Sequence, residues 1–119
     1  ICILEDFKGV FAFEKTGKYN GKYHVLNGLI SPIDDIGPED INIASLIDRI
    51  KDKDSVEVII ALKPSIEGET TTLYIKEILS KYSNVKVSRL SYGIPMGVDI
   101  DYLDELTLLN ALNERKNLS

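Results

Sequence analysis

The sequence feature that most constrains the fold is the run Val56–Leu62, which reads VEVIIAL. Its β-branched and apolar residues are typical of a central strand that is covered on both faces. Shorter runs of the same kind stand at Ile1–Leu4, Tyr23–Leu26 and Val85–Leu90. The chain therefore predicts four short strands, of which the third occupies a central position.

The segments between these runs have the periodicity of amphipathic helices. Two segments place apolar residues at positions i, i+3, i+4 and i+7, namely Ile43, Leu46, Ile47 and Ile50 in one and Ile75, Ile78, Leu79 and Tyr82 in the other. Further helices are expected at about 7–15 and 102–113, and Asn42 is the expected N-cap of the second helix. Strands that alternate with helices in this order predict an α/β fold, with a four-stranded parallel sheet and helices on both of its faces.

Two parts of different character make up the chain. Residues 1–90 hold the predicted strands and are expected to form the α/β domain, whereas residues 91–119 form a loop and the last helix. The apolar residues of that helix, which include Leu103, Leu106 and Leu109, cover more than half of its circumference. We therefore expect these leucines to contact a second surface, on the same domain or on a neighbouring subunit, unless the whole helix is deeply buried.

Charge, hydropathy and cysteine content narrow the classes of function. The net charge is −5, and lysine and arginine are scattered, so this part alone should bind DNA weakly. No apolar run approaches the about 20 residues that cross a bilayer, and no membrane contact is expected. The one cysteine, Cys2, should be buried in a strand and fits a reducing, cytoplasmic compartment. The chain opens within a predicted strand and without methionine, which suggests a fragment.

Charged residues follow two of the predicted strands. Glu5 comes directly after the first strand, and the loop Lys63–Glu69 comes directly after the third. Sites in open parallel sheets form beyond the carboxyl ends of the strands. If the first and third strands are neighbours, Glu5 and Glu67 face a common crevice. The only histidine, His24, has no partner at ligand or triad spacing and is expected to be a hydrogen-bonded structural residue.

The first strand with Glu5 at its end and the loop Lys63–Glu69 after the third strand together resemble the Toprim domain of topoisomerases, primases and related nucleases. In that family a glutamate after one strand acts in acid–base chemistry, and two acidic residues after a later strand hold magnesium. Glu5 matches the first glutamate, and the EGE sequence at 67–69 matches the end of the later motif. Lys63 and Ser65 stand where the two magnesium-binding acids would be. The resemblance implies a Toprim-like fold without catalysis and without bound magnesium. The vestigial site comprises Glu5, Lys63, Ser65 and Glu67.

The charges of this region leave several interpretations open. Lys63 is expected to form an ion pair with Glu5 or Glu67, which would replace the metal ion. Glu5 either caps or neighbours the following helix, or it belongs to the vestigial site. Glu67 and Glu69 stand at the start of a helix, where the macrodipole favours acidic side chains. Alternatively these two glutamates, together with Glu5, bind a partner protein, or they hold a weakly bound metal ion.

Further segments resemble the bacterial RecR family of recombination mediators, and they follow one another in the same order. They are Tyr23–Leu26 with Gly28 and Ile30–Pro32, Ile36–Glu39, Ile66–Thr71, Tyr92–Gly97, Asp99 and Asp104–Leu108. RecR proteins begin with a helix-hairpin-helix module and a four-cysteine zinc finger. Neither is found in this sequence, which agrees with the interpretation as a fragment, and zinc is expected only in that N-terminal part.

The RecR resemblance implies a role in DNA repair and recombination and no enzymatic activity. RecR proteins work with RecO and RecF to load RecA onto single-stranded DNA, in the bacterial cytoplasm and at the nucleoid. Their Toprim domain is a docking surface for RecO or RecF, and they assemble into ring-like homo-oligomers, here a dimer or a tetramer. The rival interpretation is an active magnesium-dependent Toprim nuclease or primase-like enzyme, against which Lys63 and Ser65 argue.

Overall fold

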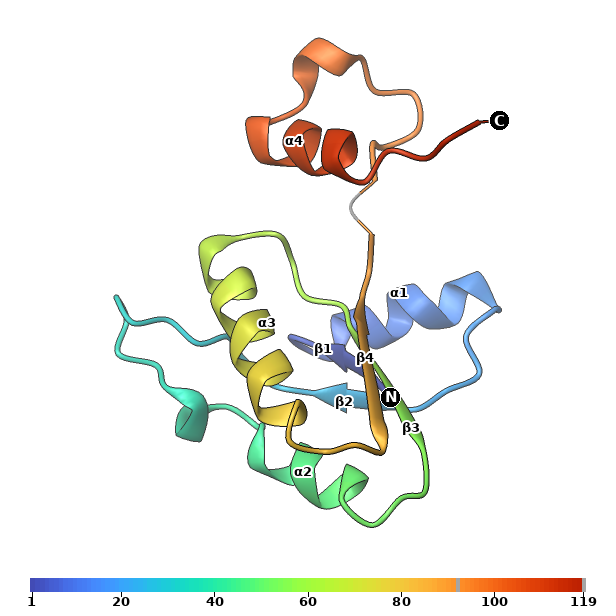
Figure 1. Ribbon diagram of the computed structural model, residues 1–119. Coiled ribbons are helices and arrows are strands. Elements are labelled where there is room, and N and C mark those ends of the chain that lie inside the picture. Colours follow the sequence, from blue (N-terminus) through green and yellow to red (C-terminus); the bar gives the residue numbers. More distant parts are fainter. Residues whose placement is uncertain (92, 119) are drawn as a thin grey trace. The chain divides into compact units, whose positions relative to one another are not determined.

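A parallel sheet forms the centre of the computed structural model, which describes residues 1–91 and 93–118 (Figure 1). The strands are β1 (Cys2–Leu4), β2 (Tyr23–Val25), β3 (Val56–Ile60) and β4 (Val85–Arg89). They lie in the order β2-β1-β3-β4, and every neighbouring pair is parallel. Cys2 lies opposite both Tyr23 and Ile59, so β1 and β3 are the two inner strands. The predicted four-stranded parallel sheet and its central third strand are confirmed.

Helices cover both faces of this sheet. They are α1 (Lys8–Thr16), α2 (Ala44–Ile50) and α3 (Ile66–Leu79), and a short 3-10 turn η1 (Pro38–Asp40) precedes α2. Successive side chains of a strand point to opposite faces. Ile3 belongs to the core beneath α2 and α3, whereas a Cβ added at Gly9 of α1 would lie 2.9 Å from a methyl carbon of Leu4. Right-handed crossovers thus place α1 on one face and the other two helices on the opposite face.

The main core lies between the sheet and the two helices α2 and α3. Alternate residues of β3, Val58 and Ile60, are buried there beside Ile3. The helices contribute the residues that their periodicity predicted, among them the buried Leu46, Ile50, Ile75 and Leu79. On the opposite face Cys2 is fully buried as expected, and burial raises the pKa of its thiol to about 11. The thiol therefore stays protonated and behaves as a small apolar residue.

The chain divides into two compact units, Ile1–Arg89 and Leu90–Ser119, whereas the sequence predicted the division after residue 90. The second unit contains a 3-10 turn, η2 (Ile100–Tyr102), and the helix α4 (Glu105–Asn113). The last helix was predicted to begin at about 102, but the carboxylate of Asp104 caps it by accepting the amide hydrogen of Thr107 at 2.7 Å. Tyr92 in the RecR-like segment 92–97, like Ser119, lies outside the described residues.

In the part of the chain that the structure describes, no helix has both the length and the apolar character needed to span a bilayer.

The predicted N-cap role of Asn42 is wrong. Helix α2 begins at Ala44, and Ile43 at its N-cap position makes no side-chain cap hydrogen bond. The Asn42 side-chain amide instead donates to the carbonyl of Val25 at 3.2 Å, and its side-chain oxygen accepts a hydrogen bond from Ser45. Asn42 therefore ties the start of α2 to strand β2, a long-range contact that local propensity does not specify.

His24 is a buried structural histidine, as expected from its isolation in the sequence. Its Nε2 lies 2.7 Å from the carbonyl oxygen of Asn42, and its Nδ1 lies 3.1 Å from a guanidinium nitrogen of Arg49. A carbonyl oxygen only accepts, so Nε2 carries the hydrogen and Nδ1 accepts from Arg49. Burial lowers the pKa of His24, and the positive charge of Arg49 lowers it further. The neutral ring is therefore the form that fits this site.

We expect the free energy of unfolding to decrease as the pH falls below the ordinary histidine pKa of about 6.5, because the unfolded chain then takes up a proton that folded His24 resists. The contribution of neutral His24 to the free energy of unfolding is fully present above that pH and is lost below it. The loss is at most about 1.4 kcal/mol for each unit by which folding lowers the pKa of His24. Urea unfolding between about pH 5.5 and 7.5 measures it. The variant His24→Gln should lose this part of the pH dependence, and an unchanged dependence would contradict the assignment.

Candidate functional site at the carboxyl ends of β1 and β3

The candidate site lies where the neighbouring strands β1 and β3 end. Glu5 follows β1 and Lys63 follows β3, and the Lys63 Nζ lies 3.7 Å from Glu5 Oε1. The side chains are 60% and 35% exposed, respectively. Of the two partners predicted for Lys63, the structure thus selects Glu5. The N-cap position of α1 is Phe7, which makes no side-chain cap hydrogen bond, and the carboxylate that accepts the amide hydrogen of Lys8, at 2.9 Å, belongs to Asp6. Glu5 therefore neighbours the helix and does not cap it.

Ser65 acts as the N-cap of α3. Its backbone is extended, and its Oγ accepts the amide hydrogen of Gly68 at 3.0 Å. The carbonyl of Ser65 accepts the first helical hydrogen bond, from the amide of Glu69 at 2.8 Å. The predicted loop 63–69 therefore ends at Ser65, and its last four residues form the first turn of the helix. Serine is among the preferred N-cap residues, which explains why the helix starts here.

Gly68 allows α3 to begin this close to the end of β3. A Cβ at position 68 would lie 1.9 Å from the backbone carbonyl oxygen of Lys63, a distance that no side chain can adopt. Gly68 lies inside a helix, so its backbone conformation does not require glycine. Glycine is needed because two backbone segments meet at this point. The contact holds Lys63 at the carboxyl end of β3 and so sets the position of its side chain beside Glu5.

The two glutamates at the start of α3 have different surroundings. Arg89, at the end of β4, binds the carboxylate of Glu69 in bidentate fashion, with N–O distances of 2.7 and 3.1 Å. Glu67 is half-buried, and within residues 1–91 and 93–118 its carboxylate makes neither a hydrogen bond nor an ion pair. Both acids lie in the first turn, where they complement the helix macrodipole. Of the acids predicted to bind a partner, Glu67 is the one not paired with a described cation.

Sequence reasoning missed Thr71, which attaches the long loop after β2 to the candidate site. Its fully buried hydroxyl donates to the carbonyl of Glu67 at 2.7 Å and accepts the amide hydrogen of Ile30 at 2.8 Å. The sequence feature that could have identified Thr71 is the run of three threonines at 70–72. Threonine inside a helix commonly donates a hydrogen bond to a carbonyl one turn earlier. The acceptor role toward Ile30 has no counterpart in the local sequence.

The residues present do not fit a magnesium site. The two positions that match acidic magnesium ligands of Toprim domains carry an ammonium group, on Lys63, and a hydroxyl that already accepts a hydrogen bond, on Ser65. Magnesium requires several hard oxygen ligands around one point. In residues 1–91 and 93–118 no three or more histidine, cysteine, aspartate or glutamate side chains gather so that they could hold a metal ion.

The leucines predicted as oligomer contacts lie in the second unit. Leu103 is half-buried, whereas Leu106 and Leu109 of α4 are 43% and 52% exposed. No residue of α4 is buried within its own unit, and what the helix packs against stays a prediction. The wide apolar surface of this helix remains exposed among the described residues.

Comparison with known proteins confirms both resemblances found in the sequence. Residues 1–91 match the Toprim domain family, and residues 93–116 match the family described as RecR, C-terminal. The protein named Recombination protein RecR of Gloeothece citriformis is 50% identical over 118 residues, which cover 99% of this chain and 58% of the relative. Its namesake in Synechococcus elongatus is 48% identical over 119 residues, which cover 100% of this chain and 59% of the relative. The chain thus spans less than two thirds of these relatives.

The variant Gly68→Ala should lower the free energy of unfolding by about 3 kcal/mol or more, because the added methyl group overlaps the Lys63 carbonyl and the start of α3 must move. Urea unfolding of the whole chain measures the change. Gly93→Ala is the matched control, since a Cβ there meets nothing within 4 Å. The control should change stability by less than about 0.5 kcal/mol, and equal effects of the two variants would refute the explanation.

Proposed function

The chain belongs to the Toprim domain family and, within it, to the RecR proteins, and we propose that it is the non-catalytic docking module of a DNA repair and recombination mediator. The supporting observation is the ion pair between Lys63 and Glu5, which lies where Toprim enzymes carry a metal ion. A lysine in that position supplies the positive charge from the protein itself. Phosphoryl transfer in Toprim enzymes relies on acidic metal ligands, and two of the matching positions here are Lys63 and Ser65.

The proposed partners are RecO and RecF, which the family resemblance implies. Glu67 is the proposed contact, since Lys63 and Arg89 already neutralise Glu5 and Glu69 within the chain. An acidic side chain at an exposed helix start can pair with a basic surface at little structural cost, because no internal hydrogen bond has to break. Glu5 and Glu69 then shape the docking surface through their ion pairs.

The remaining parts of the proposed role concern the assembled protein. We place it in a ring-like homo-oligomer that helps to load RecA onto single-stranded DNA in the bacterial cytoplasm, at the nucleoid. DNA contact and zinc are assigned to an N-terminal module outside this sequence. The net charge of −5 supports that division of roles, since it repels the phosphate backbone. No cofactor is proposed for these 119 residues.

The alternative, an active magnesium-dependent nuclease or primase-like enzyme, has no observation in its favour. The comparisons name recombination proteins, and the candidate site has lysine and serine in place of two magnesium ligands. Glu5, which would serve as the acid–base residue, is within 3.7 Å of a lysine ammonium group. A proposal of catalysis would therefore need a metal site that these residues do not form.

Replacing Lys63 and Ser65 by acidic residues should create a metal site of the Toprim type at the ends of β1 and β3. We expect Lys63→Asp combined with Ser65→Asp to bind Mn²⁺ or Mg²⁺ at millimolar concentrations, and we expect no saturable binding to the unaltered chain. Isothermal titration calorimetry measures both. Ser65→Asp alone is the control, because aspartate is an equally good N-cap and should preserve α3. Metal-dependent strand cleavage or primer synthesis by the unaltered chain, abolished by Glu5→Ala, would contradict the proposal.

Removing the charge of Glu67 should weaken partner binding. We expect Glu67→Gln to reduce the affinity for RecO or RecF about fivefold to tenfold, the effect of losing one charged contact of about 1 kcal/mol. Surface plasmon resonance at low and high salt measures the affinity and its electrostatic component. Glu77→Gln, which removes an exposed charge from the same helix, is the matched control. If Glu67 only complements the macrodipole, Glu67→Gln lowers stability slightly and leaves both affinities unchanged, which would refute the docking role.

A further inference from the structure

Two of the seven asparagines in the chain, Asn20 and Asn27, are followed directly by glycine. An asparagine side chain can react with the backbone nitrogen of the next residue, and glycine hinders this reaction least because it has no Cβ. Asparagine is for this kind of reason among the thermolabile residues of proteins. The structure places the two pairs in different surroundings. Asn20 lies in the loop between α1 and β2, and Asn27 lies shortly after β2 (Figure 1).

The pair Asn20–Gly21 is open to this reaction. Both residues are exposed, and neither the Asn20 side chain nor the Gly21 amide makes a hydrogen bond with a described residue. The Tyr19 hydroxyl reaches past the pair and donates to the carbonyl of Lys22 at 2.8 Å, and a Cβ on Gly21 would collide with that hydroxyl. Glycine at position 21 thus leaves room for the tyrosine, whereas no hydrogen bond holds Asn20.

The pair Asn27–Gly28 is held in place. The Gly28 amide, which would have to attack the Asn27 side chain, donates to the carbonyl of Glu5 at 3.2 Å. Asn27 has a left-handed backbone with a φ of 61°, and the flanking residues Leu26 and Leu29 are buried. Ring closure at Asn27 therefore requires that the hydrogen bond to Glu5 breaks and that a segment anchored in the core moves.

We propose that Asn20 is a site of spontaneous deamidation and isoaspartate formation, and that the hydrogen bond of Gly28 protects Asn27 from the same reaction. The Gly21 backbone nitrogen loses its proton to hydroxide and forms a bond to Cγ of Asn20, and the side-chain amide leaves as ammonia. The cyclic imide then takes up one water molecule. Hydrolysis at the side-chain carbonyl gives aspartate, and hydrolysis at the backbone carbonyl gives isoaspartate. Nothing is oxidised or reduced.

The surrounding charges favour the product. Lys18 and Lys22 stand two residues before and two residues after Asn20, and both are exposed without an ion pair to a described residue. A new carboxylate at position 20 therefore lies between two cations, at a surface where such pairs cost little structure. The modification changes the net charge of the chain from −5 to −6.

Isoaspartate also lengthens the main chain by one methylene group, inside the segment that the hydrogen bond from Tyr19 to Lys22 closes. The Tyr19 ring packs against Phe13 of α1 and Tyr23 of β2, with ring centroids 5.9 and 5.2 Å apart, respectively. Since no residue of α1 is buried, these ring contacts join the end of the helix to the sheet. The modification therefore acts on the attachment of α1.

Peptide mapping by mass spectrometry of the whole chain, aged at mildly alkaline pH, tests the proposal. In the folded chain we expect Asn20 to deamidate at least about fivefold faster than Asn27, the factor that one broken hydrogen bond costs. In guanidinium chloride, where neither pair is held, the two rates should become similar. A folded chain in which Asn20 keeps its amide overturns the proposal. The same ratio of rates in the folded and the unfolded chain overturns the protection of Asn27.

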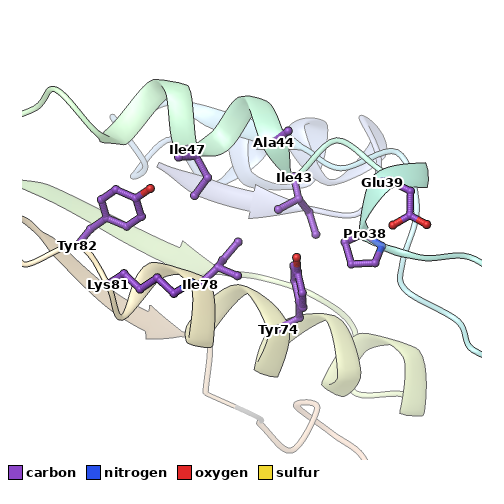
Figure 2. Close-up of a pocket in the computed structure, with 9 residues that line it drawn as sticks. All are labelled: Pro38, Glu39, Ile43, Ala44, Ile47, Tyr74, Ile78, Lys81 and Tyr82. Atoms are coloured by element: carbon purple, nitrogen blue, oxygen red, sulfur yellow. The ribbon is translucent and has the colours of Figure 1, made fainter.

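Amide signals in ¹H–¹⁵N NMR spectra show where the modification acts. We expect signals of residues 18–23 to change as Asn20 reacts. The apolar groove between α2 and α3 is the internal reference, because the residues that line it lie between 38 and 82, and Figure 2 shows Ile47 and Ile78 facing each other across it. Their signals should stay unchanged.

Two variants separate the components of the effect. Asn20→Gln, whose longer side chain closes the ring far less readily, should prevent the spectral changes during ageing. Asn20→Asp should reproduce at once the part that is due to charge and lack the part that is due to the longer main chain. Spectral changes that persist in Asn20→Gln, or that extend equally to the groove, would refute the assignment to this site.

Discussion

The contact between the helix start and the end of β3 is the constraint on which the candidate site depends. Because Gly68 has no Cβ, the first turn of α3 can lie against the carbonyl of Lys63. Ser65 caps the helix, and Lys63 is held at the edge of the sheet beside Glu5. The position of the Lys63 backbone beside the end of β1 is therefore tied to this one backbone approach. It does not require the charges to attract one another strongly.

The ion pairs themselves add little stability. Lys63 and Glu5 are 60% and 35% exposed and 3.7 Å apart, and pairs of this kind are typically worth about 0.2–1 kcal/mol. Their importance lies in where they place charge. Lys63 pairs with Glu5 and Arg89 with Glu69, while Glu67 has no ion pair with a described residue. Among the three glutamates of this region, Glu67 is thus the one without an ion pair in the described residues.

Sequence periodicity predicted the sheet, its four strands and the buried faces of α2 and α3, because these depend on side chains that alternate or recur within one element. It also predicted the pairing of Lys63 with an acid, since the topology of a parallel sheet places two strand ends together. It could not predict the hydrogen bond from the Asn42 side chain to strand β2 or the acceptor role of Thr71. Both side chains bind backbone groups that are far away in the sequence. The start of α3 was placed too late, since the Ser65 cap lies inside a motif that resembled a catalytic loop.

The glycine of the EGE motif at 67–69 indicates a packing requirement and not a metal site. Gly68 is demanded by packing at the β3–α3 junction, and that demand is the same whether the neighbouring positions bind a metal ion or not. Folding alone therefore requires glycine at this position. A matching glycine is thus a statement about the fold, and the positions that bear on metal chemistry are those that need not satisfy this packing, such as Lys63 and Ser65.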